Sequence, residues 1–230
     1  MRVQRFFFLT LISSFLSATV QAQLAIIQDK DGYTNVRDSG DINASVKFKV
    51  LHGQVMELGY YEGEEPLWIP VKIGGDVSES ECYRHQRTFR SGFMHGSRVL
   101  KFKDIPNTFI GKKDKNQAIV DTLNLQVVLT IEENVEGPEE ICRLGSDMGV
   151  GAPSNHLTNL EVTHNGKKLS IPQTALEYLY HVDLKTLSVH EYQDLLLIKI
   201  GTHSAAGYYE CAWVFQNDQF RERYVYYGNF

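Results

Sequence analysis

Two neighbouring stretches, DGYTNVRDSG (residues 31–40) and KFKVLHGQVMEL (residues 47–58), decide the fold of the N-terminal half. In the second stretch Phe48 and Val50 share one face of a strand with lysines on the other, and His52-Gly53 interrupts it. Alternation with a period of two indicates a half-buried β-strand, and Gly and Asp-rich segments between such runs indicate turns.

The same pattern extends outward on both sides. Residues 24–27 (LAII) and 67–73 (LWIPVKI) predict two more strands, and no helical period appears between residues 24 and 100. Several short strands at close spacing are typical of a small barrel or sandwich. We therefore predict an all-β protein whose residues 23–100 form a small barrel.

These residues resemble the bacterial SH3 domain family. DGYTNVRDSG is similar to the family's Asn-Val-Arg segment with its turn, and SGFMHGSRV (residues 91–99) is similar to its closing strand. The resemblance covers residues 24–100 and departs from the family at two places. Phe93 stands where the family usually has tryptophan, and residues 74–90 form an insertion that contains Cys82.

The resemblance implies a module that binds peptides, often those of the cell wall, in a groove of aromatic and polar side chains. The positions that would form the groove are Tyr33, Asn35, Tyr60, Tyr61, Trp68, Phe93 and His95. Some residues of this region have a structural role as the alternative to ligand binding. Val36 and Trp68 could belong to the hydrophobic core, and Arg37 could stabilise a turn.

The first residues predict export. Arg2 and Arg5 precede an apolar and hydroxylic run over residues 6–20, and Ala22 ends a small-residue cleavage site. This run is shorter than the roughly 20 residues that cross a bilayer, so a signal peptide over residues 1–22 is favoured over a membrane anchor. We expect the mature protein to be periplasmic or secreted, and no later segment has the length to hold it in a membrane.

The charge balance argues against nucleic acid as a partner. The chain has 23 basic and 28 acidic residues, and removal of the signal peptide changes the formal net charge from −5 to −7. A nucleic-acid-binding surface needs a basic stripe, which this composition does not favour.

The second half is also predicted to be β-rich. A linker over residues 101–115 leads into a domain over residues 116–230. Its clearest element is a hairpin around Asn165-Gly166, a pair suited to a type I′ turn. Residues 174–180, which follow Pro172, indicate a short helix, and the apolar run 195–198 suggests a strand covered on both faces. We predict an antiparallel sandwich, which vaguely resembles C-terminal β domains of secreted bacterial proteins in NGKKLSIP (residues 165–172) and in residues 205–228.

Three cysteines remain after the signal peptide: Cys82, Cys142 and Cys211. In an oxidising compartment one pair can form a disulfide. Cys142 and Cys211 belong to the same predicted domain and are the favoured pair, which would stabilise the fold by roughly 4 kcal/mol. Three unpaired thiols are the alternative.

The sequence contains only weak signals for a catalytic or metal-binding site. Cys211 is superficially similar to the nucleophile of cell-wall cysteine peptidases, but its flanks are strand-like and all eight histidines precede it. Cys82, His85 and His95 have zinc-ligand side chains without the four-ligand pattern. We therefore predict no catalytic residue, no metal site and no cofactor.

Two further groups of residues, an acidic run and three histidines, do not have the pattern of a metal-binding site. The acidic run Glu132, Glu133, Glu136, Glu139, Glu140 and Asp147 lacks the spacing of a calcium loop. His181, His190 and His203 are widely spaced in the sequence, and this spacing is typical of histidines that lie half-exposed on a sheet. The sequence thus predicts an exported non-catalytic protein that binds cell-wall peptide or a protein partner. The alternatives are a cryptic cell-wall hydrolase, or an inhibitor or immunity protein of a secreted enzyme that uses the acidic run.

Overall fold

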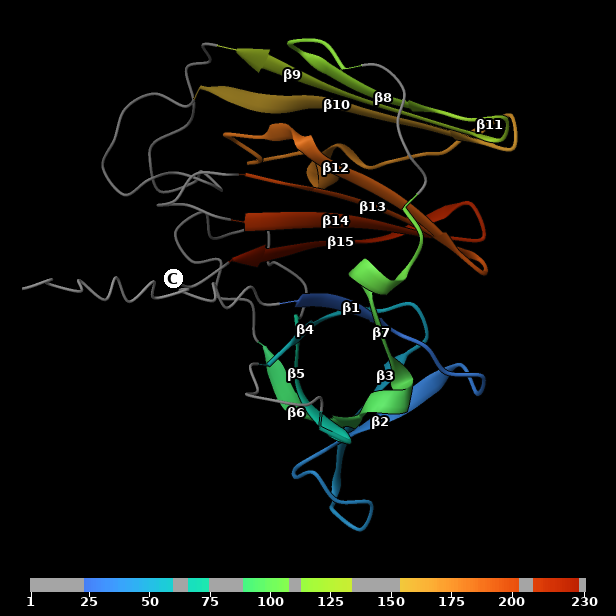
Figure 1. The fold of residues 1–230 in the computed structure, drawn as a ribbon, viewed down its shortest axis with the longest axis vertical. Helices are drawn as coiled ribbons and strands as arrows, with labels where there is room; N and C mark the ends of the chain where they lie inside the picture. The colour runs from blue at the N-terminus through green and yellow to red at the C-terminus, as the bar shows by residue number, and fades with distance from the viewer. Residues whose placement is uncertain are drawn as a thin grey trace, which may run out of the picture.

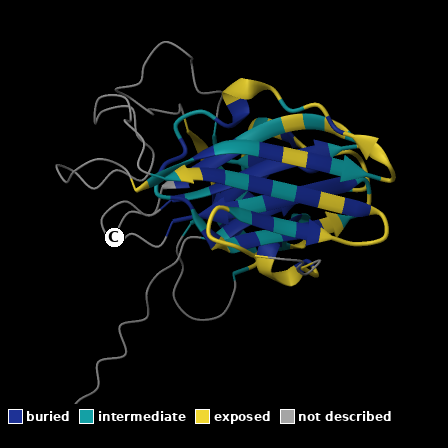
Figure 2. Ribbon diagram, turned by 90° about the horizontal axis from the view of Figure 1, so that it is seen from above, coloured by how far each residue is buried: buried dark blue, intermediate teal, exposed yellow. Residues whose placement is uncertain are grey.

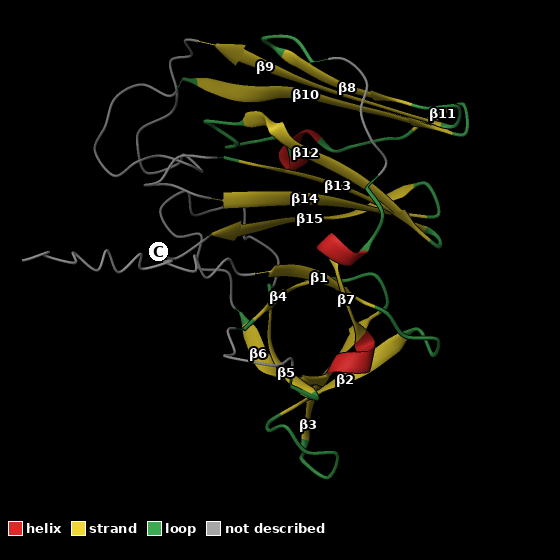
Figure 3. Ribbon diagram, in the orientation of Figure 1, coloured by secondary structure: helices red, strands yellow, loops and turns green. Residues whose placement is uncertain are grey.

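The computed structural model describes residues 23–59, 66–74, 89–107, 113–133, 154–202 and 209–227. Nearly all of the regular structure in these ranges is β-strand, and every strand pair is antiparallel. The helical segments among them are short 3-10 turns, drawn in red in Figure 3: Gly96–Arg98, Phe102–Asp104 and Gln173–Ala175. The predicted all-β class is confirmed.

The N-terminal half is one seven-stranded sheet that curls around its own core, so that Figure 1 shows it almost end-on as a ring. The strand order is β3-β2-β6-β5-β4-β1-β7. The core inside the ring contains Val36, Met56 and Met94 among its buried side chains. The strand bounds are β1 (Gln23–Ile27), β2 (Tyr33–Arg37), β3 (Val46–Leu51), β4 (Val55–Leu58), β5 (Trp68–Ile73), β6 (Arg90–His95) and β7 (Val99–Lys101).

Two glycines allow this curled sheet to form. Gly53 closes the β3–β4 turn at a φ of 78°, a left-handed conformation that favours glycine, and a Cβ there would lie 2.7 Å from Leu195 Cδ2. On β6, a Cβ at Gly92 would lie 2.4 Å from the carbonyl oxygen of Arg37. Close approach of β2 to β6 therefore requires glycine at position 92.

The C-terminal half contains two four-stranded sheets, stacked face to face in Figure 1. One has the order β11-β10-β9-β8 and the other the order β12-β13-β14-β15. Figure 2, seen from above, shows the alternation of buried and more exposed residues that such packing requires. The strand bounds are β8 (Gln117–Asp121), β9 (Leu125–Glu133), β10 (Asn155–His164), β11 (Lys167–Lys168), β12 (Asp183–Tyr192), β13 (Leu195–Gly201), β14 (Tyr209–Gln216) and β15 (Gln219–Tyr227).

The predicted hairpin joins β10 to β11. Asn165 and Gly166 have φ values of 50° and 75°, as a type I′ turn requires. Leu169 N–H then donates to the carbonyl oxygen of Val162 across the hairpin.

The sheet β12–β15 is the middle of three layers, with sheet β8–β11 on one face and the curled sheet on the other (Figure 1). Along β13, Leu196 and Ile198 pack toward sheet β8–β11, whereas Leu195 and Leu197 pack against Leu24, Ile26 and Val55 of the curled sheet. Burial on both faces explains the continuous apolar run that predicted this strand.

Two sequence expectations need correction. Residues 174–180 do not form an α-helix: a 3-10 turn, Gln173–Ala175, is followed by Tyr178 at a φ of 65°, which is incompatible with a right-handed helix. In the predicted linker, Lys101 belongs to β7 and pairs with Ala25, while Phe102 and Ile105 are buried between the two halves. The start of that segment therefore packs as part of the junction.

Candidate functional site

Three aromatic side chains of the predicted groove lie together on the outer surface of the curled sheet. Trp68 and His95 are cross-strand partners on β5 and β6, with ring centroids 5.4 Å apart in an edge-to-face arrangement. Phe93 follows on β6 opposite Pro70. All three are half-buried, so their rings are partly open to solvent. We call Trp68, Phe93 and His95 the aromatic face.

Strand alternation explains why these side chains point outward. Ile69 and Met94 lie next to them in sequence and are completely buried in the core of the curled sheet. Because successive side chains of a strand point to opposite sides, the neighbours of Ile69 and Met94 face away from that core.

The loop between β2 and β3 lies against this face. A Cβ added at Gly40 would be 3.0 Å from Trp68 Cβ and 3.8 Å from Phe93 Cδ1. Arg37 fixes the loop by donating from Nη1 to the carbonyl oxygen of Ala44 at 2.5 Å. Arg37 thus holds a turn, as its structural interpretation predicted.

One ring nitrogen of His95 makes no hydrogen bond to a described residue. Its Nδ1 accepts the backbone N–H of Ser97 at 3.2 Å and lies 2.8 Å from Ser97 Oγ. A neutral imidazole that accepts at Nδ1 carries its proton on Nε2. No described residue bonds to that Nε2–H, which can donate to a ligand carbonyl.

The other predicted groove residues are placed differently. Tyr33 packs its ring under Lys49 Nζ at 4.0 Å on the β3 side of β2. Asn35 is half-buried, and its Oδ1 has no hydrogen-bond partner among the described residues. Tyr60 and Tyr61 lie outside the described residues.

Cys211 is completely buried in β14. A nucleophile must contact its substrate, so this burial counts against the hydrolase alternative that depended on it. Cys142, Cys82 and His85 lie outside the described residues, and the predicted disulfide Cys142–Cys211 stays a prediction.

The histidines considered as a cluster make separate contacts. His190 is buried, its Nδ1 lies 3.0 Å from the carbonyl oxygen of Ile105, and burial lowers its pKa below the usual value. His181 Nδ1 lies 3.2 Å from Ser154 Oγ, and His203 is not described. Within the described ranges no group of three His, Cys, Asp or Glu side chains has the arrangement of a metal site.

Only the start of the acidic run is described. Glu132 is exposed, and Glu133 Oε2 lies 2.5 Å from Lys115 Nζ. The remaining members, Glu136, Glu139, Glu140 and Asp147, lie outside the described residues.

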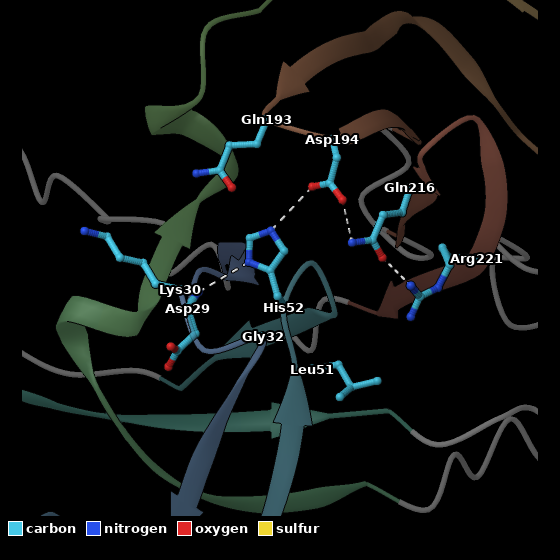
Figure 4. A pocket seen from close by; sticks show the side chains of 9 residues that line it. All are labelled: Asp29, Lys30, Gly32, Leu51, His52, Gln193, Asp194, Gln216 and Arg221. Atoms are coloured by element: carbon cyan, nitrogen blue, oxygen red, sulfur yellow. Dashed lines mark hydrogen bonds and ion pairs between the residues drawn. The ribbon is translucent and has the colours of Figure 1, made fainter.

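A cleft that sequence reasoning missed lies where the curled sheet meets the sandwich (Figure 4). Its volume is about 400 Å³, and a smaller cavity of about 150 Å³ shares four of its lining residues. Four separate connections and the strand residues that flank them supply the lining, which explains why no local motif revealed it. The lining residues are Asp29, Lys30, Gly32, Leu51, His52, Gln193, Asp194, Gln216 and Arg221.

His52 stands at the centre of this cleft and connects the two halves. Its Nδ1 accepts the backbone N–H of Asp29 at 3.3 Å, and its Nε2 lies 3.7 Å from Asp194 Oδ1 (Figure 4). Acceptance at Nδ1 puts the proton on Nε2, facing the carboxylate. Both ring nitrogens face groups of the protein, so this geometry suits a structural link rather than a general base.

The carboxylates of the cleft are already engaged. Asp29 Oδ1 lies 3.1 Å from Arg98 Nη1 and accepts the N–H of Asp31 at 2.9 Å. Asp194 Oδ2 accepts from Gln216 Nε2 at 2.7 Å and from Asn217 Nδ2 at 3.2 Å. These contacts fix the turns that line the cleft.

No known family model, curated protein or solved structure matches this chain. In the part of the chain that the structure describes, no helix has the length and apolarity to span a bilayer.

Proposed function

We propose that this protein is an exported, non-catalytic binding protein and that its aromatic face contacts a peptide of the cell wall or of a protein partner. The observation that carries the proposal is the clustering of Trp68, Phe93 and His95, half-open to solvent, on the outer face of β5 and β6. Aromatic side chains that are rigid and partly exposed are typical anchors of binding surfaces.

The chemistry of the face suits a peptide. The rings offer apolar area with little conformational entropy to lose, and the Nε2–H of His95 offers a donor for a peptide carbonyl. The resemblance to bacterial SH3 domains and the predicted signal peptide support a ligand outside the cytoplasm. The complete burial of Cys211 favours binding over the hydrolase alternative.

Co-sedimentation with insoluble peptidoglycan tests this proposal. We expect the purified mature protein to pellet with peptidoglycan, and Trp68→Ala to weaken the apparent affinity by about tenfold because it removes the largest ring of the face. His95→Ala removes a smaller ring and is expected to weaken binding by a smaller factor.

Leu123→Ala is the matched control, because Leu123 is an exposed apolar residue in the β8–β9 turn, in the other half of the chain. Thermal unfolding of each variant shows whether it is folded. A folded Trp68→Ala variant that pellets as well as the wild type would exclude the aromatic face. Failure of the wild type to pellet, with capture of a protein from a periplasmic extract that is lost in Trp68→Ala, would assign the face to a protein partner.

A further inference from the structure

Two exposed cations, Lys30 and Arg221, line the cleft at the junction and have no carboxylate partner among the described residues. Lys30 makes no ion pair or hydrogen bond there, and the contact of Arg221 is with the neutral Gln216 Oε1. Figure 4 shows them on either side of His52. Asp29 and Asp194 already accept from other groups, so neither neutralises Lys30 or Arg221 through a direct contact.

An apolar wall adjoins these cations. Leu51 lines both the larger and the smaller cavity and is 54% exposed. Leu195 and Val214 line the smaller cavity beside Arg221. A ligand here would therefore meet a guanidinium group and an apolar surface together.

We propose that this cleft binds a small ligand that carries a carboxylate next to an apolar group, with the carboxylate at Arg221 and the apolar group against Leu51. A planar guanidinium matches a carboxylate with two parallel donors. Lys30, on the opposite rim, adds longer-range attraction that salt weakens.

The surrounding charges favour a carboxylate over a phosphate. Asp29 and Asp194 line the same cleft as the two cations, and Glu222 lines the smaller cavity beside Arg221. Although these three carboxylates accept hydrogen bonds, their charges remain and repel a second negative charge on the ligand. A monoanion fits this balance better than a dianion.

This site is distinct from the aromatic face. The face lies on β5 and β6, whereas the cleft is formed by the β1–β2, β3–β4, β12–β13 and β14–β15 connections with their flanking residues. The proposal therefore does not depend on the proposed function, and a Trp68→Ala variant is expected to keep the binding at the cleft.

Titration of the mature protein with N-acetyl-leucine, followed by amide chemical shifts, tests the proposal. We expect shifts at Leu51, His52 and Gln193, and a much weaker response to N-acetyl-leucinamide, which lacks the charge. Arg221→Gln should weaken binding of the acid by about tenfold, the usual size of a lost hydrogen-bonded charge contact. Lys30→Gln should weaken it by a few fold, and added salt should remove that difference.

Lys167→Gln is the charge-matched control, because Lys167 is exposed on β11, away from the cleft. Equal responses to acid and amide, or an Arg221→Gln variant that binds as the wild type does, would overturn the proposal. No shift at cleft residues up to the solubility limit would also overturn it. Inorganic phosphate that binds as tightly as the acid would replace the carboxylate with a general anion.

Discussion

Trp213→Ala is expected to lower the free energy of unfolding by about 3 to 5 kcal/mol, the range for removing a buried large aromatic ring. Trp213 is completely buried in β14, in the core between the two sheets of the sandwich. Its Nε1–H donates to the carbonyl oxygen of Ala175 at 2.7 Å, so the variant also leaves a buried acceptor without its partner. A loss of this size is a large part of the stability of a typical protein, about 5 to 15 kcal/mol.

Urea unfolding followed by circular dichroism measures this loss. Trp213→Phe retains most of the ring and loses the N–H, so it should cost less than the alanine variant and separates the two contributions. Trp68→Ala is the matched control, because Trp68 is half-exposed and should cost less than Trp213→Ala. Equal midpoints for wild type and Trp213→Ala would contradict the packing described for the sandwich.

Val214→Asp is expected to destabilise the junction between the two halves by about 4 kcal/mol or more, because it places a charge in an apolar contact. Val214 is the neighbour of Trp213 on β14 and points to the opposite face of the sheet. There it packs among Leu24, Val55 and Leu197, which belong to both halves of the chain.

Hydrogen exchange of backbone amides shows whether the loss of stability in Val214→Asp is located at the junction. Amides of β1 and β4 should lose protection in Val214→Asp together with those of β14, because these strands share the contact. Leu123→Asp is the control: Leu123 is 98% exposed, so the same change should alter stability by no more than about 0.5 kcal/mol. Wild-type protection of β1 and β4 in Val214→Asp would mean that the halves do not depend on this contact.

Strand alternation made much of the fold predictable. The apolar residues of β3 and β5 recur every second position, as do Leu160 and Val162 of β10, and Asn165-Gly166 predicts the turn that follows. Local chemistry alone therefore specifies these elements. The run Leu195–Ile198 also predicted correctly that a strand is covered on both faces. What covers each face depends on contacts between residues far apart in the chain.

The junction between the two halves could not be predicted, because it depends on contacts between residues that are far apart in the chain. Phe102 and Ile105 stand among lysines in a segment that resembles a linker, and only packing against the middle sheet reveals them as core residues. The turn at Tyr178 is a second case, because its positive φ is not signalled by a glycine or asparagine.

The two candidate sites differ in the same way. Trp68, Phe93 and His95 come from two strands whose alternation is visible in the sequence, but the family resemblance, and not that alternation, grouped them as one groove. The cleft takes Lys30, His52 and Asp194 from three turns and Arg221 from β15, and no motif connects these four residues. Tyr33 was grouped with the aromatic face by resemblance alone, and its ring contact is with Lys49.

Tryptophan fluorescence tests the role of the aromatic face most directly, because the chain has two tryptophans in opposite environments. Trp213 is completely buried, whereas Trp68 is half-exposed, so iodide should quench Trp68 and spare Trp213. We predict that soluble peptidoglycan fragments, or the captured protein partner, protect the wild type from iodide and leave Trp68→Phe unchanged. A ligand that binds the wild type without altering the quenching of Trp68 would contradict the account.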